Sequence, residues 1–472
     1  MFVPSLRHAE LGPAFFDIVE PARFPVHLLR YRNQAWAARV GLDGLSDADW
    51  LGHFGAFEPL AGSFDRPLAL RYHGHQFRSY NPELGDGRGF LFAQLHDLAD
   101  GRLLDLGTKG SGTTPWSRTA DGRLTLKGGV REVLATAMLE ALGVYTSKSF
   151  SLVETGEALT RGDEPSPTRS AVLVRLSHSH IRIGSFQRFS FLNDTGSLRR
   201  LVDHSIAALM PECWRDDPAE RCVAFLREVC LRVARMGAAW MVAGFVHGVL
   251  NTDNINVTGE SFDYGPWRFL PIFDPAFTAA YFDHSGLYAY GRQPDTLLWN
   301  LIRLAECLLP LAGQPELQAA VGAFAPEFRR ALAAAVLRRL GLAASGEVQD
   351  SALAQSLWDF LGASQAPFEQ VFFDWFGGHA SAARAAASPA KAFYAGESFA
   401  AFRTALAAYT PLDANRLDHA YFAAPTPCTM LIGEVESIWA PIAADDDWSV
   451  FTAKLASIAA MAEAYGTGPA HP

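Results

Sequence analysis

Two stretches of the chain repeat apolar residues at helical spacing. In the first, between 127 and 143, the repeating positions are Val130, Leu134, Met138 and Leu142. The second covers 221–243, with Val223, Leu226, Val229, Cys230, Val233, Met236 and Trp240 along one face. Gly143 follows the first repeat and Gly244 the second, and glycine commonly ends a helix. The pattern predicts an amphipathic helix in each stretch.

Shorter apolar runs bounded by turn residues surround the first of these helices. The runs "GFLFAQLHD" (89–97) and "RLLDLGTKG" (102–110) are joined by Ala99-Asp100-Gly101, which predicts a β-hairpin. Further strand-like runs, "SFSLVE" (149–154) and "SAVLVRLS" (170–177), follow the helix. We predict an α+β protein with an irregular N-terminal extension (1–60), a β-rich lobe (61–195) and a helical lobe (196–472).

Composition indicates a large globular protein. Of 472 residues, 49% are hydrophobic and 19% charged, and the net charge is −10, which argues against nucleic acid or an anionic membrane surface as the main partner. No apolar run is long enough to span a membrane, and we see no signal peptide. The five cysteines form no metal-binding or disulfide pattern, so we expect a cytoplasmic protein.

The segment from His247 to Asp263 carries the strongest chemical signal. Its β-prone residues flank Thr258-Gly259-Glu260, so we expect a hairpin whose ends bring Asn254 and Asp263 together as oxygen ligands for Mg²⁺ on a nucleotide. The alternative is that both residues only cap turns. We expect Asp253 to act as a general base, or otherwise to orient the loop through backbone hydrogen bonds.

This segment also resembles the catalytic loop of small-molecule kinases. Those loops read His-Gly-Asp, with a metal-binding Asn seven positions after the His. His247 and Asn254 keep that spacing, while Val249 replaces the Asp that normally acts as base. We interpret His247 as an organiser of the loop.

Basic residues in Gly-rich or strand contexts are candidate phosphate ligands. Lys109 lies beside two glycines, and the following helix offers Glu132 as its partner; an exposed turn lysine is the alternative. The turns "LGDGRG" (84–89) and "ADGR" (120–123) form a phosphate cradle or are simply turns. Arg175, on a buried-looking strand, and Arg182 need an anion, which is either phosphate or an internal carboxylate.

Together these motifs resemble the selenoprotein O family of protein adenylyltransferases. The matching text runs from about 70 to 304 and includes "YHGHQF", "NPELGDGRG", "KGSGTTPWSR", "SHSHIRIGSF" and "GFVHGVLNTDNINVTGESFDYGPWRF". The resemblance implies a protein-kinase-like, two-lobed fold that binds ATP inverted and transfers AMP to Ser, Thr or Tyr hydroxyls of proteins. It implies that Asp253 is the base, that Asn254 and Asp263 bind Mg²⁺ (Mn²⁺ being the alternative ion), and that Glu132 pairs with Lys109. The ATP contacts that it implies are Gly85, Gly87, Arg88, Lys109, Asp121, Gly122 and Asp263, with Arg175 and Arg182 on the buried phosphates.

The chain departs from the family in two places. The helix begins "LKGGVREV" where members usually have an Arg-Ser-Ser-Ile-like stretch. Many members also end in a selenocysteine or cysteine, whereas the last cysteine here is Cys428, so we expect no terminal redox switch. Three alternative functions stay open: a phosphotransferase, a UMP transferase and a nucleotide-binding pseudokinase scaffold.

Overall fold

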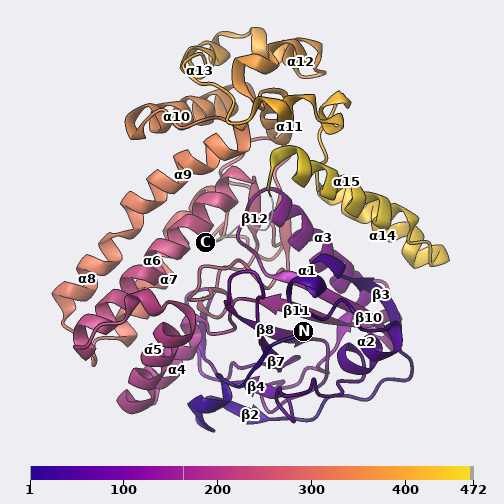
Figure 1. The fold of residues 1–472 in the computed structure, drawn as a ribbon, viewed down its shortest axis with the longest axis vertical. Coiled ribbons are helices and arrows are strands. Elements are labelled where there is room, and N and C mark those ends of the chain that lie inside the picture. The colour runs from indigo at the N-terminus through magenta and orange to yellow at the C-terminus, as the bar shows by residue number, and fades with distance from the viewer. Residues whose placement is uncertain (1, 163, 468–472) are drawn as a thin grey trace.

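The computed structural model describes residues 2–162 and 164–467. A nine-stranded antiparallel sheet forms one half of the molecule, and helices form most of the other half (Figure 1). The strand order is β2-β4-β7-β8-β11-β10-β3, with β1 beside β7 and β9 beside β11. The strands are β1 (Pro4–Ser5), β2 (Phe16–Ile18), β3 (Leu28–Arg32), β4 (Leu68–Leu70), β7 (Leu91–His96), β8 (Leu103–Lys109), β9 (Leu124–Thr125), β10 (Lys148–Leu159) and β11 (Thr168–Ser177). The α+β prediction and the predicted hairpin, β7–β8, are confirmed.

The two faces of the sheet pack against different helices. On β11, Val172, Val174 and Leu176 join a core with α1 (Gln34–Arg39) and α2 (Asp47–Phe54). Leu173 on the opposite face joins the core of α3 (Leu126–Ala141). This alternation is the two-residue period of a strand, and it places Arg175 on the α3 face.

The first 60 residues contain more regular structure than the sequence suggested. Besides the two short helices, β1, β2 and β3 from this segment join the sheet. The strand β3 lies at the edge, paired with β10, where Arg30 bonds to Glu154 at 2.7 Å. The strands β1 and β2 have two and three residues, too few for an alternating pattern to reveal them. For β3, the alternation Leu29-Arg30-Tyr31-Arg32 was the available signal.

The helical half is built around a long helix, α6 (Pro218–Val242). In Figure 1, α9 (Phe324–Leu340) runs alongside α6, and the two pack against each other. The other helices here are α4 (Ile183–Phe191), α5 (Thr195–Leu209), α7 (Gln293–Cys307), α8 (Gln314–Gly322), α10 (Glu347–Ser364), α11 (Phe368–Asp374), α12 (Ala382–Ala387) and α13 (Ala400–Leu406). Two short two-stranded sheets, β5 (Gly74–Gln76) with β6 (Ser79–Asn81) and β12 (Phe245–His247) with β13 (Trp267–Phe269), complete this part.

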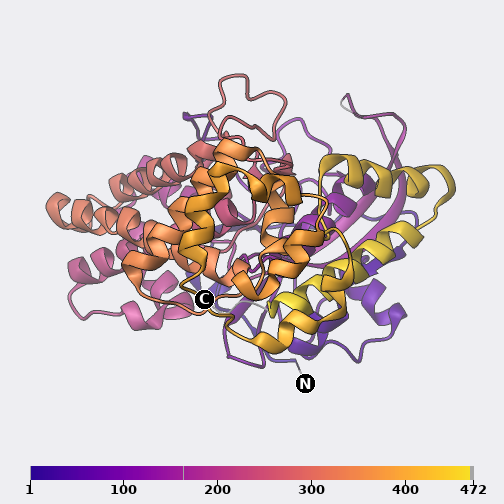
Figure 2. The same ribbon diagram turned by 90° about the horizontal axis from the view of Figure 1, so that it is seen from above.

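The last two helices return to the sheet half of the molecule. Both α14 (Ile432–Asp445) and α15 (Ser449–Tyr465) contact α3, and Figure 2 shows them apart from the α10–α13 group. Asp446, between them, pairs with Arg30 and Arg169. The C-terminal segment therefore braces the helix that carries Glu132.

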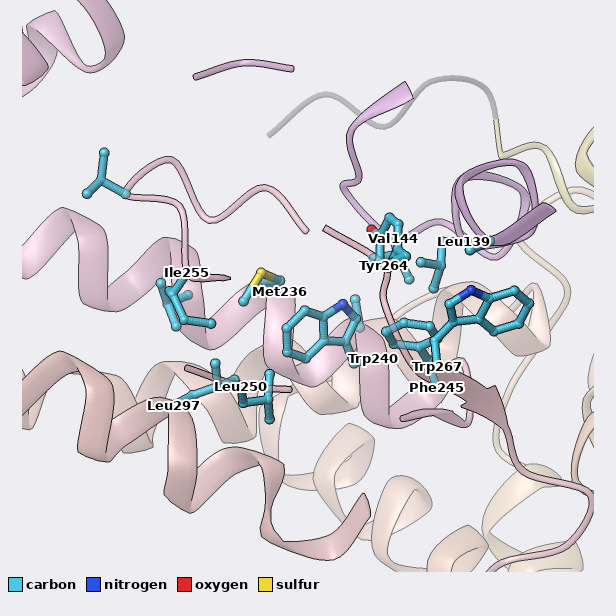
Figure 3. Close-up of a cluster of buried hydrophobic side chains, with 14 of the residues drawn as sticks. Leu139, Val144, Met236, Trp240, Phe245, Leu250, Ile255, Tyr264, Trp267 and Leu297 are labelled. Atoms are coloured by element: carbon cyan, nitrogen blue, oxygen red, sulfur yellow. The ribbon is translucent and has the colours of Figure 1, made fainter. Parts of the chain in front are cut away.

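A cluster of large apolar side chains joins the two halves. Figure 3 shows Trp240 on α6 among Phe245, Tyr264 and Trp267, with Leu139 and Val144 from the sheet half beside them. The Trp240 ring N–H donates to Ser261 Oγ at 2.9 Å. This packing fixes the loop between β12 and β13, which carries Asp253 and Asp263. Within the described ranges, no helix is both long and apolar enough to cross a membrane.

Candidate active site

The loop from 247 to 263 does not form the expected hairpin. A 3-10 turn covers Thr252–Asn254, and the residues after it pair with other parts of the chain. Val257 N–H donates to Ile181 O at 3.0 Å, and Ser261 N–H donates to Tyr145 O at 2.9 Å. The hairpin prediction is wrong because the β-prone residues of this loop bury themselves against these two neighbouring segments.

Four charged side chains meet at the α3 face of the sheet. Lys109 at the end of β8 forms an ion pair with Glu132 of α3 and lies 3.0 Å from Asp263 Oδ1. Arg175 Nη1 lies 3.1 Å from the same oxygen and 3.9 Å from Glu132 Oε2. The strand register explains the cluster, because Arg175 lies opposite Gly107 and Leu173 opposite Lys109. For Arg175, the internal carboxylate is therefore the partner that the structure shows.

Asp263 is held ionised by the bases around it. Burial by itself would raise the pKa of this carboxyl, but Lys109, Arg175 and Arg88 outweigh burial and hold the pKa well below its usual range. Its backbone adopts φ +62°, which is uncommon outside glycine. A partly buried, ionised carboxylate in a strained backbone position is typical of a functional site.

Asp253 lies in a different environment from Asp263. The residue is 8% exposed, and its Oδ1 has no hydrogen-bond partner among the described residues. Burial raises the pKa of its carboxyl to about 7, with Arg182 acting in the opposite direction. The two carboxyls therefore have separated pKa values, a condition under which one acts as a base and the other binds cations.

The short turn that carries Asp253 is anchored on both sides. His75 N–H donates to Thr252 Oγ1 at 2.7 Å, and that hydroxyl donates to Gln187 at 2.6 Å. His247 Nε2 lies 3.1 Å from Phe262 O, and Val249 N–H donates to His247 Nδ1 at 3.3 Å. Burial lowers the pKa of His247, so this imidazole is neutral and links the two ends of the loop.

A hydrogen bond holds the amide nitrogen of the Asn254 side chain in place. Its Nδ2 donates to Val249 O at 3.0 Å, and no donor in the described part of the chain bonds to its Oδ1. In Asp263, by contrast, Oδ1 accepts hydrogen bonds from both Lys109 and Arg175. Across residues 2–162 and 164–467, no group of three or more His, Cys, Asp or Glu could hold a metal ion.

Arg182 is a buried residue that contacts the backbone of Asp253. Its guanidinium lies 4.1 Å from the centre of the Tyr72 ring and 5.3 Å from that of Phe262. It donates to Asp253 O at 3.4 Å and approaches Asp86 Oδ1 at 3.5 Å. The sequence did not single out Asp86, although its place between Gly85 and Gly87 was the available signal.

The two Gly-Asp turns pack closely against neighbouring backbone and rings. A Cβ on Gly85 would lie 2.4 Å from the Trp116 ring, and one on Gly87 would lie 2.9 Å from Trp116 O. Gly122 has φ +68° and approaches the backbone of Gly112. The glycines therefore allow two loops to stack beside Lys109.

The carboxylate of Asp121 is bound by an arginine side chain. Its carboxylate accepts two hydrogen bonds from Arg161, at 2.8 and 3.1 Å. Arg123 of the same turn pairs with Glu157 at 2.7 Å. Asp121 lies outside the Lys109 cluster, on the exposed rim formed by these pairs.

A basic cavity of about 500 Å³ opens from the Lys109 cluster toward solvent. Its volume lies in the range typical of small-molecule sites. Tyr264, Tyr281 and Phe282 provide aromatic lining. Its cationic lining residues are Arg88, Lys109, Arg123, Lys127, Arg131, Arg161 and Arg268, and its acidic ones are Glu132, Glu164 and Glu436. Sequence reasoning missed Lys127 and Arg131, whose spacing of four residues on α3 was the signal for a shared helix face.

Comparison with known proteins places the chain in a family. Residues 2–459 match the family described as "Protein adenylyltransferase SelO". A relative from Gloeobacter violaceus, "Protein nucleotidyltransferase YdiU", is 44% identical over 455 residues, covering 94% of this chain and 92% of the relative. A relative from Synechocystis sp. with the same description is 42% identical, covering 95% of this chain and 96% of the relative. Another from Synechococcus elongatus is 49% identical, covering 71% of this chain and 67% of the relative.

Proposed function

Because the chain belongs to the protein adenylyltransferase SelO family, we infer that it is a nucleotidyltransferase that moves AMP from ATP onto a protein. The observation that carries this inference is the Lys109–Glu132–Arg175–Asp263 cluster, of which Lys109 and Glu132 line a basic cavity. Arginine and lysine side chains on one wall neutralise a triphosphate. The sheet half and the helical half then correspond to the two lobes of a kinase-like fold, with 1–60 as extension, 61–195 as the β-rich lobe and 196–472 as the helical lobe.

We propose that ATP enters with its γ-phosphate innermost. Arg175 and Arg182 are both buried, at 7% and 4% exposed, deeper than the exposed Arg88 at the rim. Phosphate oxygens are better partners for the buried guanidinium of Arg182 than its weak, 3.5 Å contact with Asp86. In this orientation the α-phosphate faces Asp253, and Gly85, Gly87, Asp121 and Gly122 line the outer end.

A divalent ion fits the oxygen donors that the loop offers. Asn254 Oδ1 and the Asp263 carboxylate are hard ligands of the kind that Mg²⁺ binds together with nucleotide phosphates. The ion would neutralise charge on the phosphates during transfer. Lys109 and Arg175 hold Asp263 in place, and Val249 O fixes the carboxamide of Asn254.

Asp253 is the proposed base. Its free Oδ1 can accept the proton of a Ser, Thr or Tyr hydroxyl on the protein substrate, and a pKa of about 7 matches that role at neutral pH. The oxygen of that hydroxyl then bonds to the α-phosphorus, and pyrophosphate leaves. An Asp253 that only oriented the loop would instead be expected to use both carboxylate oxygens on backbone N–H groups.

The deciding experiment compares ATP labelled on the α- or the γ-phosphate. Label transferred to protein from α-labelled ATP alone supports AMP transfer, and mass spectrometry of the modified protein should show an AMP adduct. Transfer from γ-labelled ATP would make the protein a phosphotransferase, and preferential use of UTP with Mn²⁺ would make it a UMP transferase. Nucleotide binding without any transfer would indicate a nucleotide-binding pseudokinase scaffold.

Asp263→Ala is the matched variant for this experiment. It removes the proposed metal ligand and the shared partner of Lys109 and Arg175, so transfer and Mg-ATP binding should both be lost. Asp274→Ala serves as control, since Asp274 is a turn residue whose carboxylate accepts, among the described residues, only from Ala276 N–H. Unchanged self-labelling by Asp263→Ala would refute the mechanism.

A further inference from the structure

A second basic cavity, of about 230 Å³, lies between α6 and α9 and shares no lining residue with the first. Four arginines line it: Arg232 and Arg235 from α6, and Arg330 and Arg338 from α9. None of the residues that line it is acidic. The proposed nucleotidyl transfer makes no use of this cavity.

The arginines there are only partly neutralised. The charge of Arg232 is neutralised, because the carboxylates of Glu212 and Glu228 each lie 2.8 Å from it. Arg235 and Arg330 share the single carboxylate of Glu327, at 2.6 Å each. Arg338 has no ion-pair partner in the described part of the chain. Three guanidiniums therefore face the cavity with one carboxylate between them.

The inner wall combines apolar surface with one unused polar group. Met236, Ala239 and Ala335 are buried, and Figure 3 shows Met236 one turn before Trp240 on α6. Alanines keep α6 and α9 from filling the space between them. Thr258, 1% exposed, lines the same cavity, and its Oγ1 has no hydrogen-bond partner among residues 2–162 and 164–467. A buried hydroxyl normally has a partner, so this one is available to a ligand.

We propose that this cavity binds a small phosphate monoester with an apolar body. Its volume lies below the range of about 300–1,000 Å³ that holds drug-sized ligands, so the ligand is small. Guanidinium groups and a hydroxyl donor suit the three terminal oxygens of a phosphate, and the alanine and methionine wall suits an apolar group. The cavity offers more hydrogen-bond donors than a ligand with a carboxylate, which has two oxygens, would use.

The position of the cavity connects it to the candidate active site. Thr258 and Gly259, which line it, lie between Asp253 and Asp263 along the chain. Gly143, which also lines it, follows α3, the helix that carries Glu132. A ligand held there contacts both segments, so its binding should also protect them from hydrogen exchange.

The test is calorimetric titration of the full chain with phenyl phosphate. We expect saturable binding that Arg338→Gln weakens by at least about tenfold, the effect of losing one charge-assisted hydrogen bond. Thr258→Val should also weaken binding without lowering stability, because its hydroxyl bonds to no other described residue. Arg329→Gln, an exposed neighbour on α9 outside the cavity, is the matched control and should bind as the unmodified chain does.

Three results would overturn the proposal. Absence of saturable binding at millimolar probe would show that the cavity has no phosphate site. Equal binding of phenol would show an apolar hollow only. A loss caused by Arg131→Gln, in the nucleotide cavity, but not by Arg338→Gln would place the probe in the first cavity. None of these results depends on whether the chain transfers AMP.

Discussion

Glu260 is a buried carboxyl whose titration should control the stability of the loop between Asp253 and Asp263. It is 4% exposed, and its Oε2 accepts a hydrogen bond from His178 N–H at 2.8 Å. Burial raises the pKa of this carboxyl from 4.5 to about 7, although Lys148, the His178 N–H and Arg102 act in the opposite direction. The folded protein therefore keeps a proton that the unfolded chain loses at lower pH.

This difference makes stability depend on pH. The contribution of Glu260 to the free energy of unfolding is fully present below pH 4.5 and is lost as the pH rises through about 7. Each pH unit within this window costs about 1.4 kcal/mol, so the whole window costs about 3 kcal/mol. Glu260→Gln removes the titration while its amide oxygen can still accept from His178 N–H.

The measurement is urea unfolding of the unmodified chain and of Glu260→Gln from about pH 4 to about pH 8. The stability of the variant relative to the unmodified chain should rise by about 3 kcal/mol across this range. Glu397→Gln, at an exposed position, is the control and should show no such trend. A relative stability of Glu260→Gln that does not change with pH would refute the argument that Glu260 is protonated in the folded state.

Three further predictions concern the site and the core that supports it. Asp253→Asn should lower kcat of AMP transfer by about 10²–10⁴-fold with Mg-ATP binding retained; a variant with unchanged kcat would exclude Asp253 as base. Arg175→Met should lower transfer at least about 100-fold, measured with α-labelled ATP, whereas normal activity would exclude Arg175 as a phosphate ligand. Trp240→Ala should lower the free energy of unfolding by about 3–5 kcal/mol, measured by urea, and a loss below about 1 kcal/mol would contradict its role in joining the two halves.

Local patterns were sufficient to predict several elements. The four-residue repeat from Val130 to Leu142 identified α3, and the Ala99-Asp100-Gly101 turn identified the β7–β8 hairpin, because helical period and turn chemistry are properties of neighbouring residues. The chemical types of Lys109, Asn254 and Asp263 likewise indicated phosphate and metal chemistry. The family resemblance added the choice of AMP transfer, which no single motif implies.

Long-range packing decided the rest. The segment 255–262 has strand-like residues, yet it pairs with residues 145–147 and 181–183 because burial there outweighs closing on itself. The register of β8 against β11 sets Lys109 and Arg175 on the same face of the sheet, beside Glu132. The pairing of 255–262, together with the bond from Trp240 to Ser261, holds the loop against the sheet half, where Asp263 contacts both bases. The sequence alone thus determined which residues could do the chemistry. Only the tertiary structure decided which of them meet, because contacts between distant segments depend on register and burial that no local pattern encodes.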